Sequence, residues 1–192
     1  KLSVAEGVSV TFRTDITETN WGANSGFGAG RSGSTQQWDR AHIDLEKNDM
    51  HLRAGQQLIV LGKSGFDSQD NGLTFNYKGA IPVTVFYMLD NDNGSKNKAD
   101  KFQYGVRVAH GTDAYKAQVF GLAQNDSNNG EDAYGIGVTF ETKIADLVKI
   151  YAEGEYFGGD ASPGKDAMGE QFQIDASMML SETVTLGGQF FY

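Results

Sequence analysis

The stretch YGIGVTFE, residues 134–141, decides the fold because its side chains alternate in character. Tyr134, Ile136, Val138 and Phe140 share one face, while glycine, threonine and glutamate occupy the other. A period of two belongs to a β-strand. The stretch FQIDASM, residues 172–178, repeats the pattern with amide and carboxylate side chains at its polar positions. Charged and amide residues in that register are typical of a transmembrane β-barrel with lipid outside and water inside.

The same alternation recurs along the whole chain and predicts an all-β, antiparallel, up-and-down transmembrane β-barrel that forms a single domain over residues 1–192. Long polar connections at 21–36, 62–71, 90–100, 124–132 and 157–169 alternate with short turns. A closed single-chain barrel needs an even strand number, and about 11–12 strands are visible here. Either one strand is missed in this count, or the chain is part of a larger barrel of about 16 strands. Eleven strands are predicted, near residues 7–20, 37–46, 51–61, 73–78, 83–89, 102–108, 115–121, 134–141, 148–156, 172–178 and 184–192.

Composition narrows the function classes. The chain has no cysteine, only two prolines, 25 glycines and a formal net charge of −9. An acidic chain lacks the basic surface that phosphate backbones require, so nucleic acid is not expected as a partner. No run of about 18 apolar residues offers a transmembrane helix.

Several stretches resemble bacterial outer-membrane porins, namely WDRAHIDL (38–45), LRAGQQ (52–57), FQYGVRV (102–108) and LGGQFFY (186–192). The resemblance is one of pattern and extends over nearly the whole chain. It implies a water-filled pore for passive diffusion of ions and small hydrophilic solutes, often trimeric, with an inward-folded loop narrowing it. It also implies an outer-membrane location, with membrane lipid and lipopolysaccharide as neighbours and a homotrimer as the assembly.

The alternation also predicts which charged residues line the pore. Seven basic and seven acidic side chains fall on the polar face, so the wall is neutral by this count and the net acidity lies in the remaining residues. Acidic loops would draw cations to the mouth, which predicts a mild cation preference. Ordinary solvated charge on a wet surface explains the same pattern. The predicted pore-lining residues are Arg13, Asp15, Arg40, His42, Asp44, Glu46, Arg53, Lys78, Arg107, Lys116, Glu141, Lys149, Glu153, Glu155 and Asp175.

Three further patterns in the sequence partly resemble ligand-binding sites. Asp90 and Asp92 resemble the start of a calcium loop, but the position of the bidentate glutamate is Lys101, so no cofactor is expected and Ca²⁺ stays a weak candidate. The glycine-rich segment 22–33 lacks the helix of a nucleotide site and reads better as an outer loop that folds into the pore. His42 and His51 lack an evident third metal ligand.

No arrangement typical of Ser-His-acid catalysis is recognisable, so the protein is predicted not to be an enzyme. Two alternatives to a porin remain open at this point. One is a soluble or secreted all-β ligand-binding protein, which would have to bury the charged face. The other is a membrane barrel that acts as an anchor or adhesin through its loops.

Overall fold

The computed structural model describes residues 1–15, 37–63, 67–91, 101–126, 131–145, 147–162, 165–181 and 183–192. Within these residues the chain forms twelve β-strands, in which β-branched and aromatic residues recur at alternate positions. The strands are β1 (Leu2–Ala5), β2 (Val8–Asp15), β3 (Gln37–Lys47), β4 (Met50–Val60), β5 (Asp67–Tyr77), β6 (Val83–Asn91), β7 (Lys101–Gly111), β8 (Tyr115–Asp126), β9 (Glu131–Ile144), β10 (Val148–Ser162), β11 (Lys165–Met179) and β12 (Thr185–Phe191).

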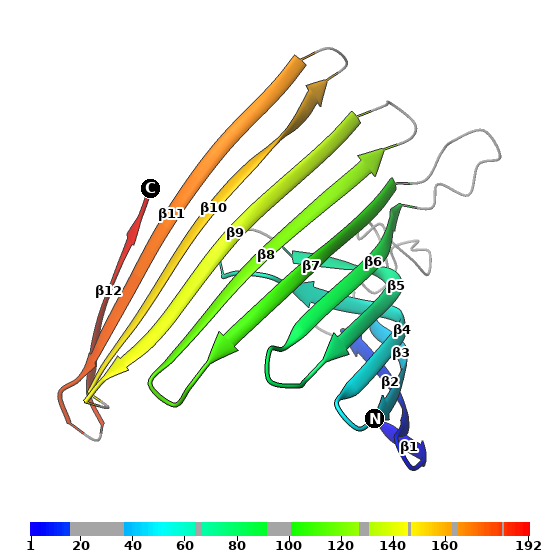
Figure 1. Cartoon of the computed structure of the whole chain (residues 1–192), viewed down its shortest axis with the longest axis horizontal. Helices are drawn as coiled ribbons and strands as arrows, with labels where there is room; N and C mark the ends of the chain where they lie inside the picture. Colours follow the sequence, from blue (N-terminus) through cyan, green and yellow to red (C-terminus); the bar gives the residue numbers. More distant parts are fainter. Residues whose placement is uncertain are drawn as a thin grey trace, which may run out of the picture.

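Each strand pairs antiparallel with the next one along the chain and so forms a single sheet in the order β1 to β12. Figure 1 shows that the sheet curls, with the N-terminal strands turned away from the direction of β8 to β11. In the part of the chain that is described, β1 and β12 are the two edges of the sheet. The predicted antiparallel, up-and-down, all-β topology is therefore confirmed.

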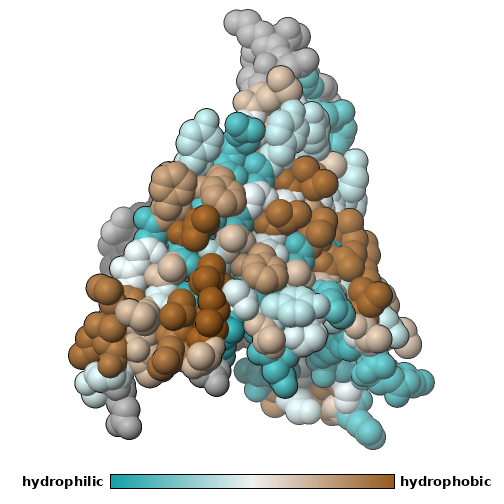
Figure 2. Space-filling view, turned by 60° about the vertical axis from the view of Figure 1, so that its left-hand side comes forward, coloured by the Kyte–Doolittle hydropathy of each residue, from teal (hydrophilic) through white to brown (hydrophobic). Residues whose placement is uncertain are grey.

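The convex face of the sheet is apolar and exposed. Val138 and Ile136 in β9 are 52% and 53% exposed, and similar side chains cover the outer face of the other strands. Figure 2 shows many of them as hydrophobic areas across the face that it presents. A soluble barrel would bury such residues, whereas a membrane barrel turns them toward lipid. The arrangement argues against the soluble alternative.

The concave face holds the polar side chains. His42, Asp44, Thr74, Glu153 and Gln173 are all buried there, although they are hydrophilic. Their positions follow the predicted parity of each strand, because successive side chains point to opposite faces. Polar side chains on this face hydrogen-bond to one another, as Thr74 does to Gln57 at 2.8 Å and Gln173 to Asp175 at 2.7 Å.

Two expectations about strand boundaries need correction. The sequence-based count missed β1, a four-residue strand whose Leu2 lies opposite Val10, and this strand makes the count even. The connections predicted at 124–132 and 157–169 are largely strand, since β8 reaches Asp126 and β10 reaches Ser162. Pairing continues past the apolar band, where the side chains no longer alternate and the sequence signal is lost. Long and short connections therefore alternate less sharply than predicted.

A search of the described residues finds no helix that is long and apolar enough to span a membrane.

We predict that Val138→Arg destabilises the protein in lipid by about 2–4 kcal/mol, because it places a charge on the lipid face near the middle of β9. Ser177→Arg, which adds the same side chain on the concave face, should cost less than about 1 kcal/mol. Urea unfolding of the protein in lipid vesicles measures both. Equal losses of stability would contradict the assignment of the two faces.

Candidate functional site

A short segment that begins at the last residue of β4 crosses the concave face. This inward segment consists of Val60, Leu61, Gly62 and Lys63. The backbone N–H of Lys63 donates a 2.7 Å hydrogen bond to Glu153 of β10. Five strands separate β4 from β10 in the sheet, so this contact spans the hollow side of the curled sheet and not a neighbouring ladder.

The base of the inward segment rests on an apolar patch in an otherwise polar wall. This inner patch consists of Ile59, Leu61, Phe86, Met88, Phe120 and the partly buried Leu122. Leu61 is only 2% exposed and Phe120 only 1%. Burial of apolar area is non-directional and holds the segment against β6 and β8. The patch is an apolar area on an otherwise polar wall, and it lies where the backbone of the inward segment rests on that wall.

Two hydrogen bonds fix the backbone of the segment above that patch. Gln118 Nε2 of β8 donates to the carbonyl of Leu61 at 2.6 Å. Arg107 of β7 donates to the carbonyl of Val60 at 3.2 Å and to Thr84 at 3.1 Å. Leu61 follows Val60, the last residue of β4 that pairs with β5, so Gln118 bonds a carbonyl that lies beyond this ladder. Arg107, a predicted pore-lining residue, therefore supports the segment.

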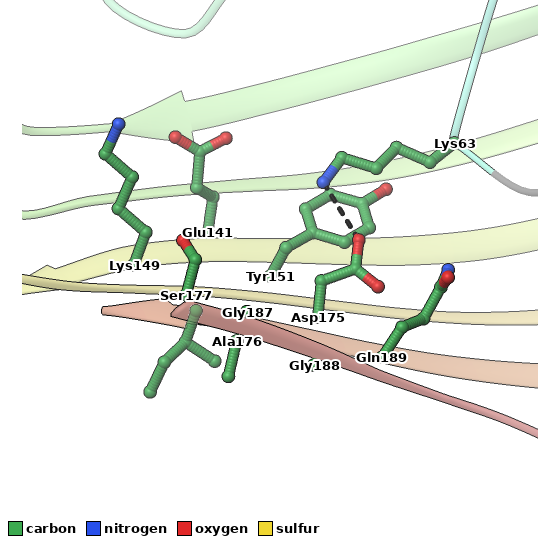
Figure 3. A pocket seen from close by; sticks show the side chains of 11 residues that line it. Lys63, Glu141, Lys149, Tyr151, Asp175, Ala176, Ser177, Gly187, Gly188 and Gln189 are labelled. Carbon is green, nitrogen blue, oxygen red and sulfur yellow. Dashed lines mark hydrogen bonds and ion pairs between the residues drawn. The ribbon is translucent and has the colours of Figure 1, made fainter. Parts of the chain in front are cut away.

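The tip of the inward segment is held by opposite charge. Lys63 Nζ lies 3.2 Å from Asp175 of β11 and 3.7 Å from the centre of the Tyr151 ring. Figure 3 shows the lysine reaching over the ring toward the carboxylate. Both an ion pair and a cation–π contact thus favour its position. The lysine side chain is still 52% exposed, so its charge also acts on the space around it.

Carboxylates and amides cover the wall that faces this lysine. Glu153 and Glu155 of β10 are 1% and 5% exposed. Tyr151 donates a hydrogen bond to Glu153, and Gln171 donates one to Glu155. Gly62 packs directly against both carboxylates, and an added Cβ would overlap them. The absence of a side chain at Gly62 is what allows the backbone to come this close.

A second charged cluster lies toward the short-turn end of β3 and β4. Asp44 is 2% exposed. Arg53 Nε donates to its Oδ1 at 2.7 Å, and His51 Nε2 lies 2.7 Å from the same atom. His42 Nε2 lies 3.5 Å from Oδ2. Three nitrogen-bearing side chains around one buried carboxylate form a cross-strand clamp between β3 and β4.

The remaining predicted pore-lining residues are spread over the concave face. Arg13 and Arg40 lie opposite each other in β2 and β3. Lys78 pairs with Glu46 at 3.4 Å. The other two are placed by register, with Lys116 opposite Glu141 and Lys149 opposite Ser177. The side chain of Asp15 lies outside the described residues. Their role as pore lining stays a prediction.

Sequence reasoning missed the inward segment and its anchor. Lys63 fell within a predicted loop, and Phe120 and Leu61 had no reason to be singled out. The only available signal was a run of inward apolar residues at 86, 88, 120 and 122, which violates the alternation. The glycine-rich segment 22–33, the predicted pore-entering loop, lies outside the described residues. So does Asp92, as does the side chain of Asp90, and no metal-holding group of His, Asp or Glu occurs among the residues described.

Comparison with known proteins supports the fold. No family model matches the chain, and no curated protein matches it. Among solved structures, OmpT, an outer membrane protein of Vibrio cholerae, superposes with a TM-score of 0.57 and 16% identity over 96% of this chain. Its loop L8 deletion mutant gives a TM-score of 0.56 and 18% identity over 95%. The chain spans 65% and 69% of the lengths of these two proteins.

This protein has the fold of outer-membrane β-barrel proteins. The predicted barrel class is thereby confirmed, and the bacterial outer-membrane neighbours support the predicted location. At 16–18% identity, this similarity supports the fold alone. It does not indicate which molecules the protein binds or transports.

The sequence-based prediction that the protein is not an enzyme was wrong. It relied on the lack of a recognisable catalytic arrangement in the sequence. The likeness to the OmpT structures overturns it, because outer-membrane barrels of one fold can host different activities. The correction reopens the question of catalysis and assigns no catalytic residue.

We expect Asp44→Asn to lower the free energy of unfolding by about 2–3 kcal/mol, because Arg53 and His51 would lose the buried carboxylate that they face. Glu46→Gln, at a half-exposed carboxylate bonded to Lys78, should cost less than about 1 kcal/mol. Urea midpoints in lipid vesicles compare the two variants. A loss no larger for Asp44→Asn than for Glu46→Gln would show that the clamp contributes little.

Phe120→Ala should loosen the inward segment, because it removes the largest buried ring under Leu61. Amide hydrogen exchange in peptides that contain residues 60–63 should accelerate about tenfold. Phe190→Ala, at a ring that is 59% exposed on the outer face, should leave that exchange unchanged. Equal protection in both variants would mean that the patch does not hold the segment.

Proposed function

We propose that the protein is an outer-membrane channel for passive diffusion of ions and small hydrophilic solutes. The single observation that supports this best is the inward segment, which brings Lys63 across a polar concave face to Asp175. A wall lined by hydrophilic residues and narrowed by backbone suits a sieving pore, in which width and charge select the solutes.

Charge on the wall sets the selectivity in this proposal. Buried carboxylates at Glu153 and Glu155, with Asp175 nearby, face Lys63 at the tip of the segment. The net charge of −9 adds a wider negative potential that attracts cations and weakens with salt. Mild cation preference follows from both. In this proposal the carboxylates that attract cations lie on strands β10 and β11, whereas the sequence analysis attributed the cation preference to acidic loops.

The assembly expected for such a channel is a homotrimer surrounded by membrane lipid and lipopolysaccharide. The exposed apolar outer face gives lipid or a second barrel a surface to cover. No cofactor enters the proposal.

Planar-bilayer recording tests the channel and its selectivity together. The protein should give stepwise conductance and a reversal potential that favours K⁺ under a KCl gradient. Lys63→Gln should strengthen that preference about twofold, because it removes a positive charge from the narrowed region. Lys78→Gln, at a lysine bonded to Glu46 toward the short-turn end, should change it less.

Two results would count against the proposal. Absence of conductance from folded, inserted protein would refute the channel. Conductance with a chloride preference would refute the selectivity while leaving the channel in place.

A further inference from the structure

A hollow on the concave face of β9 to β12 carries both signs of charge. Its volume is about 510 Å³, and its lining includes Lys63, Glu141, Lys149, Tyr151 and Asp175. Figure 3 shows Glu141 and Lys149 on one side of Tyr151, and Lys63 with Asp175 on the other. The hollow is therefore divided into two charged halves around one aromatic ring.

The two halves differ in how their charges are satisfied. Lys63 and Asp175 form an ion pair at 3.2 Å. Glu141 and Lys149 form no ion pair among the described residues. Register places Glu141 between Lys116 and Tyr151, and Lys149 between Lys143 and Ser177. They are diagonal neighbours that line one space without pairing within the described part of the chain. A ligand with one positive and one negative group can engage both at once.

The floor of the hollow leaves room for such a ligand. Gly187 and Gly188 of β12 also line it, and glycine leaves the strand without a side chain there. Gly187 lies opposite Ser177, and a Cβ added at Gly187 would make only ordinary contacts, the nearest at 3.5 Å to the carbonyl oxygen of Ala176. Ser177 adds a hydroxyl beside Lys149 and Gln189 an amide beside Asp175, and both groups can donate and accept hydrogen bonds.

We propose that this hollow binds small zwitterions of the amino-acid and dipeptide class. Glu141 accepts from the ligand's ammonium group, and Lys149 donates to its carboxylate. The inference rests on the proposed function and deepens it, because it names a class of solute that the wall retains during passage. Singly charged solutes engage one of the two side chains, and neutral solutes engage neither.

Isothermal titration of the detergent-folded full chain tests the site without requiring transport. Glycylglycine is the probe, N-acetylglycine lacks its ammonium group, and glycinamide lacks its carboxylate. Glycylglycine should bind about fivefold more tightly than either analogue, as expected for one additional exposed charge pair.

Matched variants separate recognition from general damage. Glu141→Gln should abolish the advantage of glycylglycine over N-acetylglycine, and Lys149→Gln should abolish its advantage over glycinamide. The double exchange Glu141→Lys with Lys149→Glu should restore binding of glycylglycine, because both charges are again present. Lys78→Gln, outside the hollow, should leave all three affinities unchanged.

Equal affinities for the three ligands, or undetectable binding of glycylglycine, would overturn the inference. So would single variants that bind glycylglycine as the unmodified protein does. Bilayer conductance is recorded on the same preparations. A conducting protein without this preference refutes the zwitterion site alone, whereas a protein that binds glycylglycine but does not conduct refutes the channel alone.

Discussion

The separation of lipid from water by one layer of backbone is the constraint on which the rest of the structure depends. A strand in a bilayer has no water for its amides, so all twelve strands bond to their neighbours along the chain. Pleating then sends alternate side chains to opposite faces. Val138 is exposed on one face for the same reason that Thr139 is buried on the other. The buried polar side chains of the described residues are collected on the concave side.

The inward segment is the main exception to this arrangement, because it places backbone on the concave face. The contacts of that backbone explain why the segment is stable. Backbone that leaves a ladder needs new hydrogen-bond partners, and Gln118 supplies one to Leu61, while Arg107 bonds the carbonyl of Val60 where β4 ends. It also needs a surface, which the apolar inner patch supplies through Phe86 and Phe120. Charge then fixes its tip through Lys63. Three different interactions, each drawn from a different strand pair, therefore hold four residues in place.

Strand type, antiparallel order and the face of nearly every residue could be predicted from the sequence, because a period of two is a local property. Asp44 and Arg53 could be placed on the same face, but their contact depends on the register between β3 and β4. The conformation of the turn at Asn48 sets that register, and the alternation of side chains does not reveal it. The contact between Lys63 and Asp175 joins residues 112 positions apart and depends on sheet curvature. No periodicity encodes it. The four residues of β1 were missed because the strand is too short to show a period.

The lengths of β10 and β11 have a consequence for the surface of the cell. Each has 15 residues, whereas a tilted strand crosses a bilayer in about 9–11. Their ends are still paired, with Gly159 opposite Ala167 and Asp160 opposite Asp166. About four residues of each strand thus extend past the bilayer, and β9 stays paired with β10 as far as Ala133 opposite Gly159. An antibody or phage that approaches the cell meets a rigid ridge there, and a peptide grafted onto its end would be held at a fixed height above the membrane.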